Sequence, residues 1–313
     1  MRKKTFPGYR FLLVGLACVA SMHLTVLRIS QHAGGEELSK PSTSRTAKQS
    51  AIKAIPLDQL NQEARKKVLS VINNTSVYRR LPASRYVCDP DMHNFLIRYP
   101  EVIVGIWKVM GITQVDAKRV GQYEISATDG MGTSSNVELL YGTRNLHVFY
   151  GQGFYQGPLF HNKLRGSCIL VLRSEFGHNR NGDPIVQDRL DVFLRVDNIG
   201  VKILARTLHS LVGKTADINF TESTKFIGKV SDTAEVNGSG VQRLGNRIEN
   251  LEPEVREAFG KLAILVNDRA AGRLQEQLKV DTHPTNRAKI KTYQPQSLPP
   301  IRPASGPIVR ARN

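Results

Sequence analysis

The feature that most constrains the fold is an alternation of apolar and polar side chains that recurs through residues 112–197. Leu190 and Val192, for example, are separated by a single residue, and neighbouring side chains of a strand point to opposite faces. Turn signals such as Asp129-Gly130 separate the alternating runs. Short connections between such runs predict a curved antiparallel meander of five to seven strands, with one face packed and the other partly solvated.

Helical spacing flanks this region on both sides. Before it, apolar residues recur every three or four positions in 57–72, and Pro100 suits the first turn of another helix that ends at Gly111. After Ile199 the period returns to 3.6, which predicts helices up to residue 280. Helices, then consecutive strands, then helices are typical of an α+β fold.

Changes in composition divide the chain into six predicted segments. They are a signal peptide or single transmembrane anchor at 1–29, a flexible tether at 30–56, a short amphipathic helix at 57–80, an α+β domain at 81–237, a helical extension at 238–280, and a disordered, basic, proline-rich tail at 281–313.

The order of elements in the α+β domain resembles that of a known superfamily. A leading pair of helices, consecutive strands and a helix at 199–212 that packs back onto them are similar to the START and polyketide-cyclase helix-grip superfamily, over roughly residues 90–235. The resemblance implies a pocket for a lipid or another apolar ligand between sheet and helix. It implies no fixed catalytic residues.

The N-terminus has the pattern of a membrane-targeting segment. Residues 11–27 contain no Asp, Glu, Lys or Arg, and four basic residues precede them. Seventeen residues is the lower limit for a helix that spans a bilayer core of about 30 Å, and somewhat long for a cleaved signal. The basic flank keeps the N-terminus in the cytoplasm. We therefore expect a single anchor or a cleaved signal, with the body on the non-cytoplasmic (periplasmic or extracellular) side.

The basic charge lies mainly in the terminal segments. The chain has a formal charge of +17, of which residues 81–280 contribute about +2 by subtraction. A nucleic-acid-binding domain would concentrate basic side chains on its folded body, so no nucleic-acid partner is expected. The basic tails either bind an anionic surface, such as lipid headgroups, or simply keep the chain soluble.

Cys88 and Cys168 would face an oxidising compartment if the body is exported. They either form a disulfide or remain two buried free thiols, because spacing alone does not bring their Cα atoms within reach.

The most unusual local composition is the aromatic and glycine-rich stretch 141–160. Its rings either line the wall of a ligand pocket or belong to the core of the sheet; they are Phe149, Tyr150, Phe154 and Tyr155. Arg173 and Arg195 alternate with apolar residues on predicted strands. They either hold the anionic group of a ligand or form a solvated, salt-bridged sheet face.

No catalytic, cofactor or metal motif stands out. Asp89, Asp91 and His93 lie close together, but Asp91 as a helix N-cap accounts for the most suggestive of them, so no metal site is predicted. A Ser/His/Asp triad assembled from distant residues stays open, because triads are defined by geometry. The sequence favours a non-enzymatic binder of an apolar or lipid-like ligand or of a protein partner. The alternatives are an exported hydrolase or cyclase-like enzyme, and a scaffold whose basic tails bind anionic surfaces.

Overall fold

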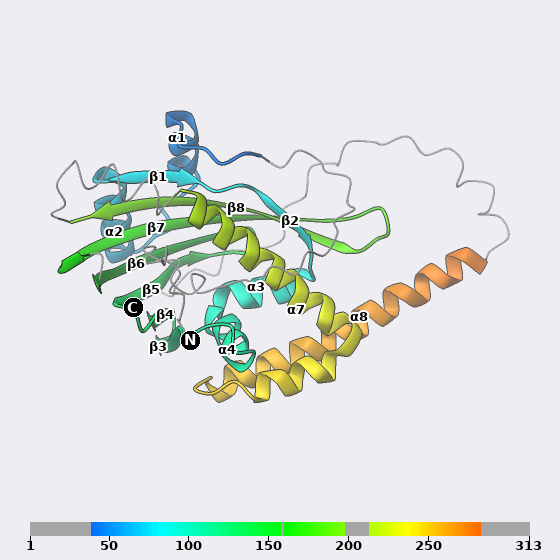
Figure 1. Ribbon diagram of the computed structural model, residues 1–313. Coiled ribbons are helices and arrows are strands. Elements are labelled where there is room, and N and C mark those ends of the chain that lie inside the picture. The colour runs from blue at the N-terminus through cyan, green and yellow to red at the C-terminus, as the bar shows by residue number, and fades with distance from the viewer. Residues whose placement is uncertain (1–38, 158–159, 198–212, 283–313) are drawn as a thin grey trace, which may run out of the picture.

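The computed structural model describes residues 39–157, 160–197 and 213–282 (Figure 1). The fold is α+β, with an open antiparallel sheet packed against helices. The helices are α1 Arg45–Lys53, α2 Gln62–Asn73, α3 Pro90–Arg98, α4 Pro100–Val109, α7 Lys214–Asn246 and α8 Pro253–Thr282. The strands are β1 Val77–Arg80, β2 Ser84–Val87, β3 Asp116–Gly121, β4 Glu124–Thr128, β5 Thr133–Gly142, β6 Leu146–Gly157, β7 Phe160–His178 and β8 Pro184–Val196.

The sheet has eight strands, and six of them form the predicted meander. β3 to β8 pair in sequence order, each antiparallel to the next. The two short strands β1 and β2, which the sequence did not predict, both pair with β8 and continue the sheet beyond it. The period-two pattern therefore gave the correct fold class and the correct run of consecutive strands.

Helices cover both faces of the sheet. On one side, here called the α7 face, alternate residues of β7 and β8 pack against the start of α7; they include Cys168, Leu170, Leu172, Val192 and Leu194. On the other side, the α2 face, the residues between them pack against α1 and α2; they include Ile169, Val171 and Phe193. The central strands are thus buried on both faces, because segments from opposite ends of the chain cover them.

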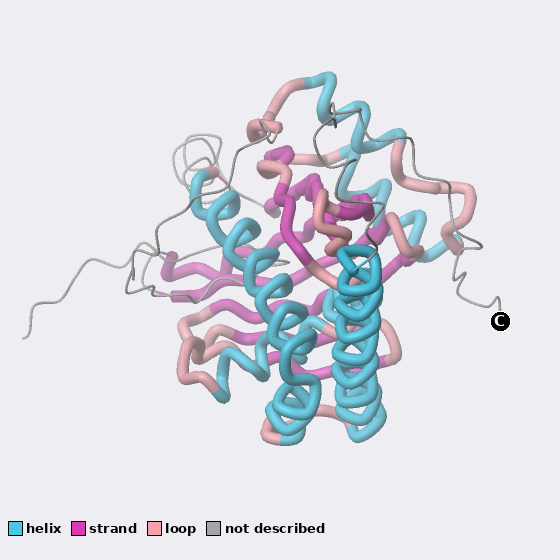
Figure 2. The backbone as a smooth tube through the Cα atoms, turned by 90° about the vertical axis from the view of Figure 1, so that its right-hand side faces the viewer, coloured by secondary structure: helices cyan, strands magenta, loops and turns pink. Residues whose placement is uncertain are grey.

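The two long C-terminal helices run side by side, with the sheet behind them in Figure 2. They approach closely where α7 has glycines: a Cβ on Gly238 would lie 2.6 Å from the carbonyl oxygen of Ala263. Asn237 has non-helical backbone angles, so α7 is kinked there. The kink coincides with the predicted boundary at residue 237. The helix continues across it, so α7 belongs both to the sheet packing and to the helical extension.

The chain turns sharply between α3 and α4. Asp89 caps α3 by accepting hydrogen bonds from the backbone of Asp91 and Met92, so the N-cap is Asp89 and not Asp91 as the sequence suggested. Tyr99 lies outside helical geometry, as expected for a residue before proline, and Pro100 begins α4. This corner faces one side of the sheet.

The N-terminal segment differs from the prediction. Residues 45–53 of the predicted flexible tether form α1, which Ser44 caps. Its buried residues, Ala47 and Ala51, belong to the core on the α2 face. The sequence did not predict this helix because its solvent face is polar and its buried residues are small. The predicted helix at 57–80 is also shorter, because α2 ends at Asn73 and β1 follows.

Several predictions fall outside the described residues. They are the apolar segment at 11–27, the helix at 199–212 and nearly all of the tail at 281–313. Within the ranges that the structure describes, no helix has the length and apolar character needed to cross a membrane.

Of the two alternatives for the cysteines, the structure has the buried free thiols and not the disulfide. Cys88 and Cys168 are both free and buried, and they belong to separate clusters of the core. Cys88 packs near α3 and Cys168 lies on the sheet beneath the start of α7. Burial raises the pKa of both thiols, that of Cys168 to about 12, which keeps them protonated and unreactive.

Candidate functional site

A half-enclosed cavity of about 250 Å³ lies between the α3–α4 corner and strands β3 to β6. Its sheet wall comes from the α7 face, since Leu139 pairs with Phe149 and Phe149 with Leu170. The lining is mainly aliphatic and aromatic, and it includes two guanidinium groups, that of Arg98 at the end of α3 and that of Arg119 on β3. The lining residues are Arg98, Tyr99, Pro100, Arg119, Gln122, Tyr123, Ile125, Val137, Leu139, Leu140, Tyr141, Gly142 and Phe149. An apolar wall with a few convergent polar groups is the usual composition of a small-molecule site.

Arg119 fastens the corner to the sheet. Its Nε donates to Glu101 at 2.6 Å, its Nη1 to the carbonyl of Gln122 at 2.9 Å, and its Nη2 to the carbonyl of Arg98 at 3.0 Å. The guanidinium also lies 4.8 Å from the ring centre of Tyr99. Arg119 and the buried Glu101 are thus an ion pair with a structural role.

Arg98 has a different environment. Its Nε donates to His147 Nε2 at 3.4 Å, and no described carboxylate forms an ion pair with it. His147 is fully buried, and burial, followed by the positive charge of Arg98, lowers its pKa to about 3. His147 is therefore neutral at physiological pH and does not compensate the charge. The cavity wall carries one guanidinium without an acidic partner in the described part of the chain.

A second polar cluster lies under α3, away from the cavity. The hydroxyls of Tyr86 and Ser174 donate to the two carboxylate oxygens of Asp188, at 2.6 and 2.7 Å. The ring of His93 contacts both hydroxyls, at 2.9 and 3.1 Å. A serine, a histidine and an aspartate from distant positions thus do meet, but the serine proton points to the carboxylate. Ser174, His93 and Asp188 are almost completely buried, and none lines a described cavity. The arrangement fixes α3 onto the sheet.

Arg173, which the sequence suggested as a ligand-binding residue, instead binds a carboxylate in the core. Its Nη2 lies 2.5 Å from the fully buried Asp191, which also accepts hydrogen bonds from Tyr78 at 2.6 Å and from Arg80 at 2.8 Å. Asp191 is therefore part of a buried network and not of a solvated sheet face. The covering helices α1 and α2 explain the difference.

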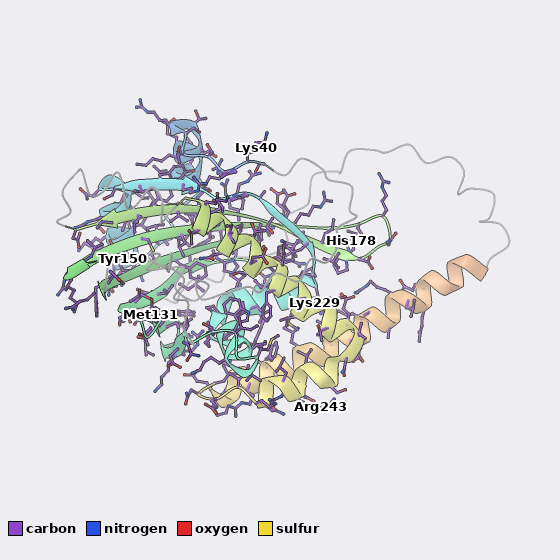
Figure 3. All side chains as sticks on the ribbon, viewed as in Figure 1. Lys40, Met131, Tyr150, His178, Lys229 and Arg243 are labelled. Carbon is purple, nitrogen blue, oxygen red and sulfur yellow. The ribbon has the colours of Figure 1, made fainter. Side chains whose placement is uncertain are left out.

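Three other predicted residues meet in an open groove of about 460 Å³ on the α2 face, beyond the end of α2. They are Tyr150, which Figure 3 labels on the sheet, Phe154 and Arg195. These three residues already have partners within the protein. Arg195 pairs with Asp197 at 3.1 Å, and Lys67 and Lys163 lie over the Tyr150 and Phe154 rings.

The two remaining aromatic residues lie on the α7 face. Phe149 lines the cavity, and Tyr155 is completely buried in the core. The aromatic stretch therefore divides between cavity, groove and core, as expected when alternate residues of one strand face opposite ways. Sequence reasoning missed Arg98. Its only signal was a basic residue just before the Tyr99-Pro100 helix break.

Comparisons with known proteins give little further information. No protein-family model matches the chain, and a search of curated proteins finds no match. Among solved structures, a conserved protein from Geobacillus kaustophilus matches with 12% identity and a TM-score of 0.33, covering 47% of this chain and 90% of that one. The di-domain ARO/CYC BexL from the BE-7585A biosynthetic pathway matches with 12% identity and a TM-score of 0.24, covering 61% of this chain and 56% of that one. No family model confirms the helix-grip resemblance.

Proposed function

We propose that this protein is a membrane-tethered or exported binding protein whose folded body holds a small, largely apolar ligand in the cavity between the α3–α4 corner and the sheet. The observation that supports this proposal most directly is the lining. Aliphatic and aromatic side chains from three strands, β4, β5 and β6, converge on one half-enclosed space, and the guanidinium groups of Arg98 and Arg119 also line it. A helix-grip domain would hold its ligand on this face of the sheet.

The size of the cavity limits the ligand. Its 250 Å³ is slightly below the range of roughly 300–1,000 Å³ that is usual for drug-sized molecules. At about 30 Å³ for each water-sized group, it has room for roughly eight such groups. A compact ligand therefore fits better than a long-chain lipid.

Cavity-filling variants test this proposal. Val137 lies in the wall and is 9% exposed, so Val137→Phe would place a ring in the cavity. Asn136→Phe is the matched control, because the neighbouring side chain points to the α2 face. We expect Val137→Phe to abolish binding of small aromatic probes, measured by calorimetry, and Asn136→Phe to leave it intact. Equal binding by both variants would contradict the proposal.

Export of the folded body to the non-cytoplasmic side is a separate part of the proposal and needs a separate test. It rests on the uncharged segment 11–27 and the basic residues before it. A reporter enzyme fused to the C-terminus, active only outside the cytoplasm, should be active in the full chain and inactive after deletion of residues 1–29. Activity that does not depend on the leader, or a purely cytosolic signal, would remove the export proposal without affecting the cavity.

A further inference from the structure

We propose that the ligand of this cavity carries a carboxylate, bound through the Nη1 and Nη2 atoms of Arg98, and that its apolar part packs against the sheet. This inference rests on the proposed function and specifies the chemical class of its ligand. It follows from the charges around the cavity, from the contact that orients Arg98, and from the cavity's size.

The charges around the cavity do not balance. Arg119 forms a direct ion pair with Glu101, and both side chains are almost buried, with exposures of 7% and 5%. Arg98, at the end of α3, has no ion pair among the described residues. An Arg beside an apolar wall is stabilised by an anion because water solvates it only partly there. One uncompensated positive charge matches one negative charge, which favours a carboxylate over a doubly charged phosphate.

His147 determines which edge of Arg98 is available. Arginine can only donate hydrogen bonds, so the contact at 3.4 Å means that His147 Nε2 accepts and that its proton is on Nδ1. With Nε directed to His147, the two Nη atoms form the remaining edge of the fork. Two parallel N–H donors on such an edge match the two oxygens of a carboxylate. His147 is therefore a positioning residue for Arg98.

The apolar part of the ligand would lie against Ile125, Val137 and Phe149, which share the α7 face of their strands. Phe149 offers an aromatic surface and stands parallel to the His147 ring, with centroids 6.2 Å apart and an interplanar angle of 15°. A planar acid of roughly eight or nine non-hydrogen atoms, such as an aromatic or short branched carboxylate, fits the available volume.

The experiment compares two probes of nearly equal shape. Benzoate and benzamide differ in charge and in the oxygen that only the acid presents. Binding of each is measured by calorimetry to the full-length wild-type chain and to the variants Arg98→Met and Arg98→Lys. We expect the wild type to bind benzoate at least tenfold more tightly than benzamide. Arg98→Met should remove that preference, and Arg98→Lys should retain only part of it, because an ammonium lacks the fork.

Arg165→Met is the matched control. Arg165 is exposed and lines the groove on the opposite face of the sheet, so its loss should leave benzoate binding unchanged. Circular dichroism and thermal unfolding show that each variant is folded. Loss of benzoate binding in Arg165→Met but not in Arg98→Met would place the ligand in the groove and overturn the inference.

The remaining outcomes separate this inference from the function on which it rests. Equal binding of benzoate and benzamide, blocked by Val137→Phe and unchanged by Arg98→Met, would keep a binding cavity but overturn the carboxylate. Benzoate affinity that falls in Arg98→Met and in Val137→Phe alike would support both. No binding of benzoate, benzamide, hexanoate or hexanol to the wild type would count against both.

Discussion

Two aspartates on β8 are fully buried, and each is held by a different set of partners. Asp188 accepts from two neutral hydroxyls and lies beside His93, whereas Asp191 is bound by two arginines and a tyrosine. Burying a carboxylate is costly unless its oxygens are hydrogen-bonded, and both residues meet that condition. Asp188 faces α3 and Asp191 faces α1 and α2. The two networks therefore attach helices to opposite sides of one strand.

Replacing Asp191 should strongly destabilise the protein. In Asp191→Ala, Arg80, Arg173 and the Tyr78 hydroxyl lose their common partner inside the core, and we expect the free energy of unfolding to fall by about 3–5 kcal/mol. Asp197→Ala is the control, since the Arg195–Asp197 pair is 37% exposed on each side and should change stability by less than about 1 kcal/mol. Urea unfolding monitored by fluorescence measures both. Similar small losses would mean that the network contributes little.

The buried histidine that contacts Arg98 should make the stability of the protein pH-dependent. His147 has a folded-state pKa of about 3, whereas the ordinary pKa of a histidine is 6.5, so the unfolded chain binds a proton more readily. The contribution of neutral His147 to the free energy of unfolding is complete above pH 6.5 and is lost progressively as the pH falls toward 3. Between pH 7.5 and pH 5 we expect a loss of about 2 kcal/mol from this residue. The pH dependence of urea unfolding should be smaller by that amount in His147→Asn; identical slopes would contradict the assignment.

At the scale of elements, helix packing depends on missing side chains as much as on present ones. α7 contributes Gly238 and Gly245 to its contact with α8, and a Cβ on Gly245 would lie 2.8 Å from the ring of Phe259. The same helix begins on the sheet through Ala216 and Phe220. The kink at Asn237 lies between the part of α7 that packs on the sheet and α3 and its glycine-rich part, and Glu235, just before the kink, already contacts Asn267 and Arg273 of α8.

A methyl group should therefore have opposite effects at two glycines. Gly238→Ala would force α7 away from the backbone of α8, and we expect a loss of about 1–3 kcal/mol in the free energy of unfolding. Gly272→Ala meets no atom within 4 Å and lies inside α8, so it should stabilise by up to about 1 kcal/mol through helix propensity. Thermal unfolding of both variants measures the difference. Equal effects would show that the helices adjust freely.

The elements that sequence predicted well are those with a clear period. The alternation of Leu190 and Val192 with polar residues predicted β8 and its inner face, and Pro100 predicted the start of α4. α1 was missed because its buried residues are alanines, which carry little apolar signal. The cavity was only partly foreseen: Phe149 came from composition, but Arg98 acquires its environment from β3 and β6, and no local pattern encodes such distant contacts.

On the scale of the whole molecule, the sheet lies between an N-terminal and a C-terminal helical layer. Figure 1 shows α1 and α2 near one edge of the sheet and α7 crossing it, with the end of α8 extending away from the body. The two layers are joined through β8, which pairs with β1, β2 and β7. The folded unit therefore includes α1, which lies within the segment that composition assigned to a tether.

Truncation tests this description of the folded unit. A chain that begins at residue 39 keeps α1 and the bridge between Ser42 and Arg80, whereas one that begins at residue 57 lacks both. The shorter chain also loses Ile55, which is 5% exposed, and the contact of Arg80 with the carbonyl of Ala47. We expect it to be less stable by at least about 2 kcal/mol. Equal urea midpoints for the two chains would show that α1 is an accessory to the fold.

The pairing of β1 with β8 also governs the order of events during biosynthesis. Tyr78 on β1 and Asp191 on β8 are 113 residues apart, yet they share a hydrogen bond in the finished core. Nascent β1 must wait, exposed, while the whole meander emerges from the ribosome, because a contact between distant residues forms only after the loop between them closes. The strand that is made first is therefore among the last to pair, because its partner is the last strand of the sheet to be made.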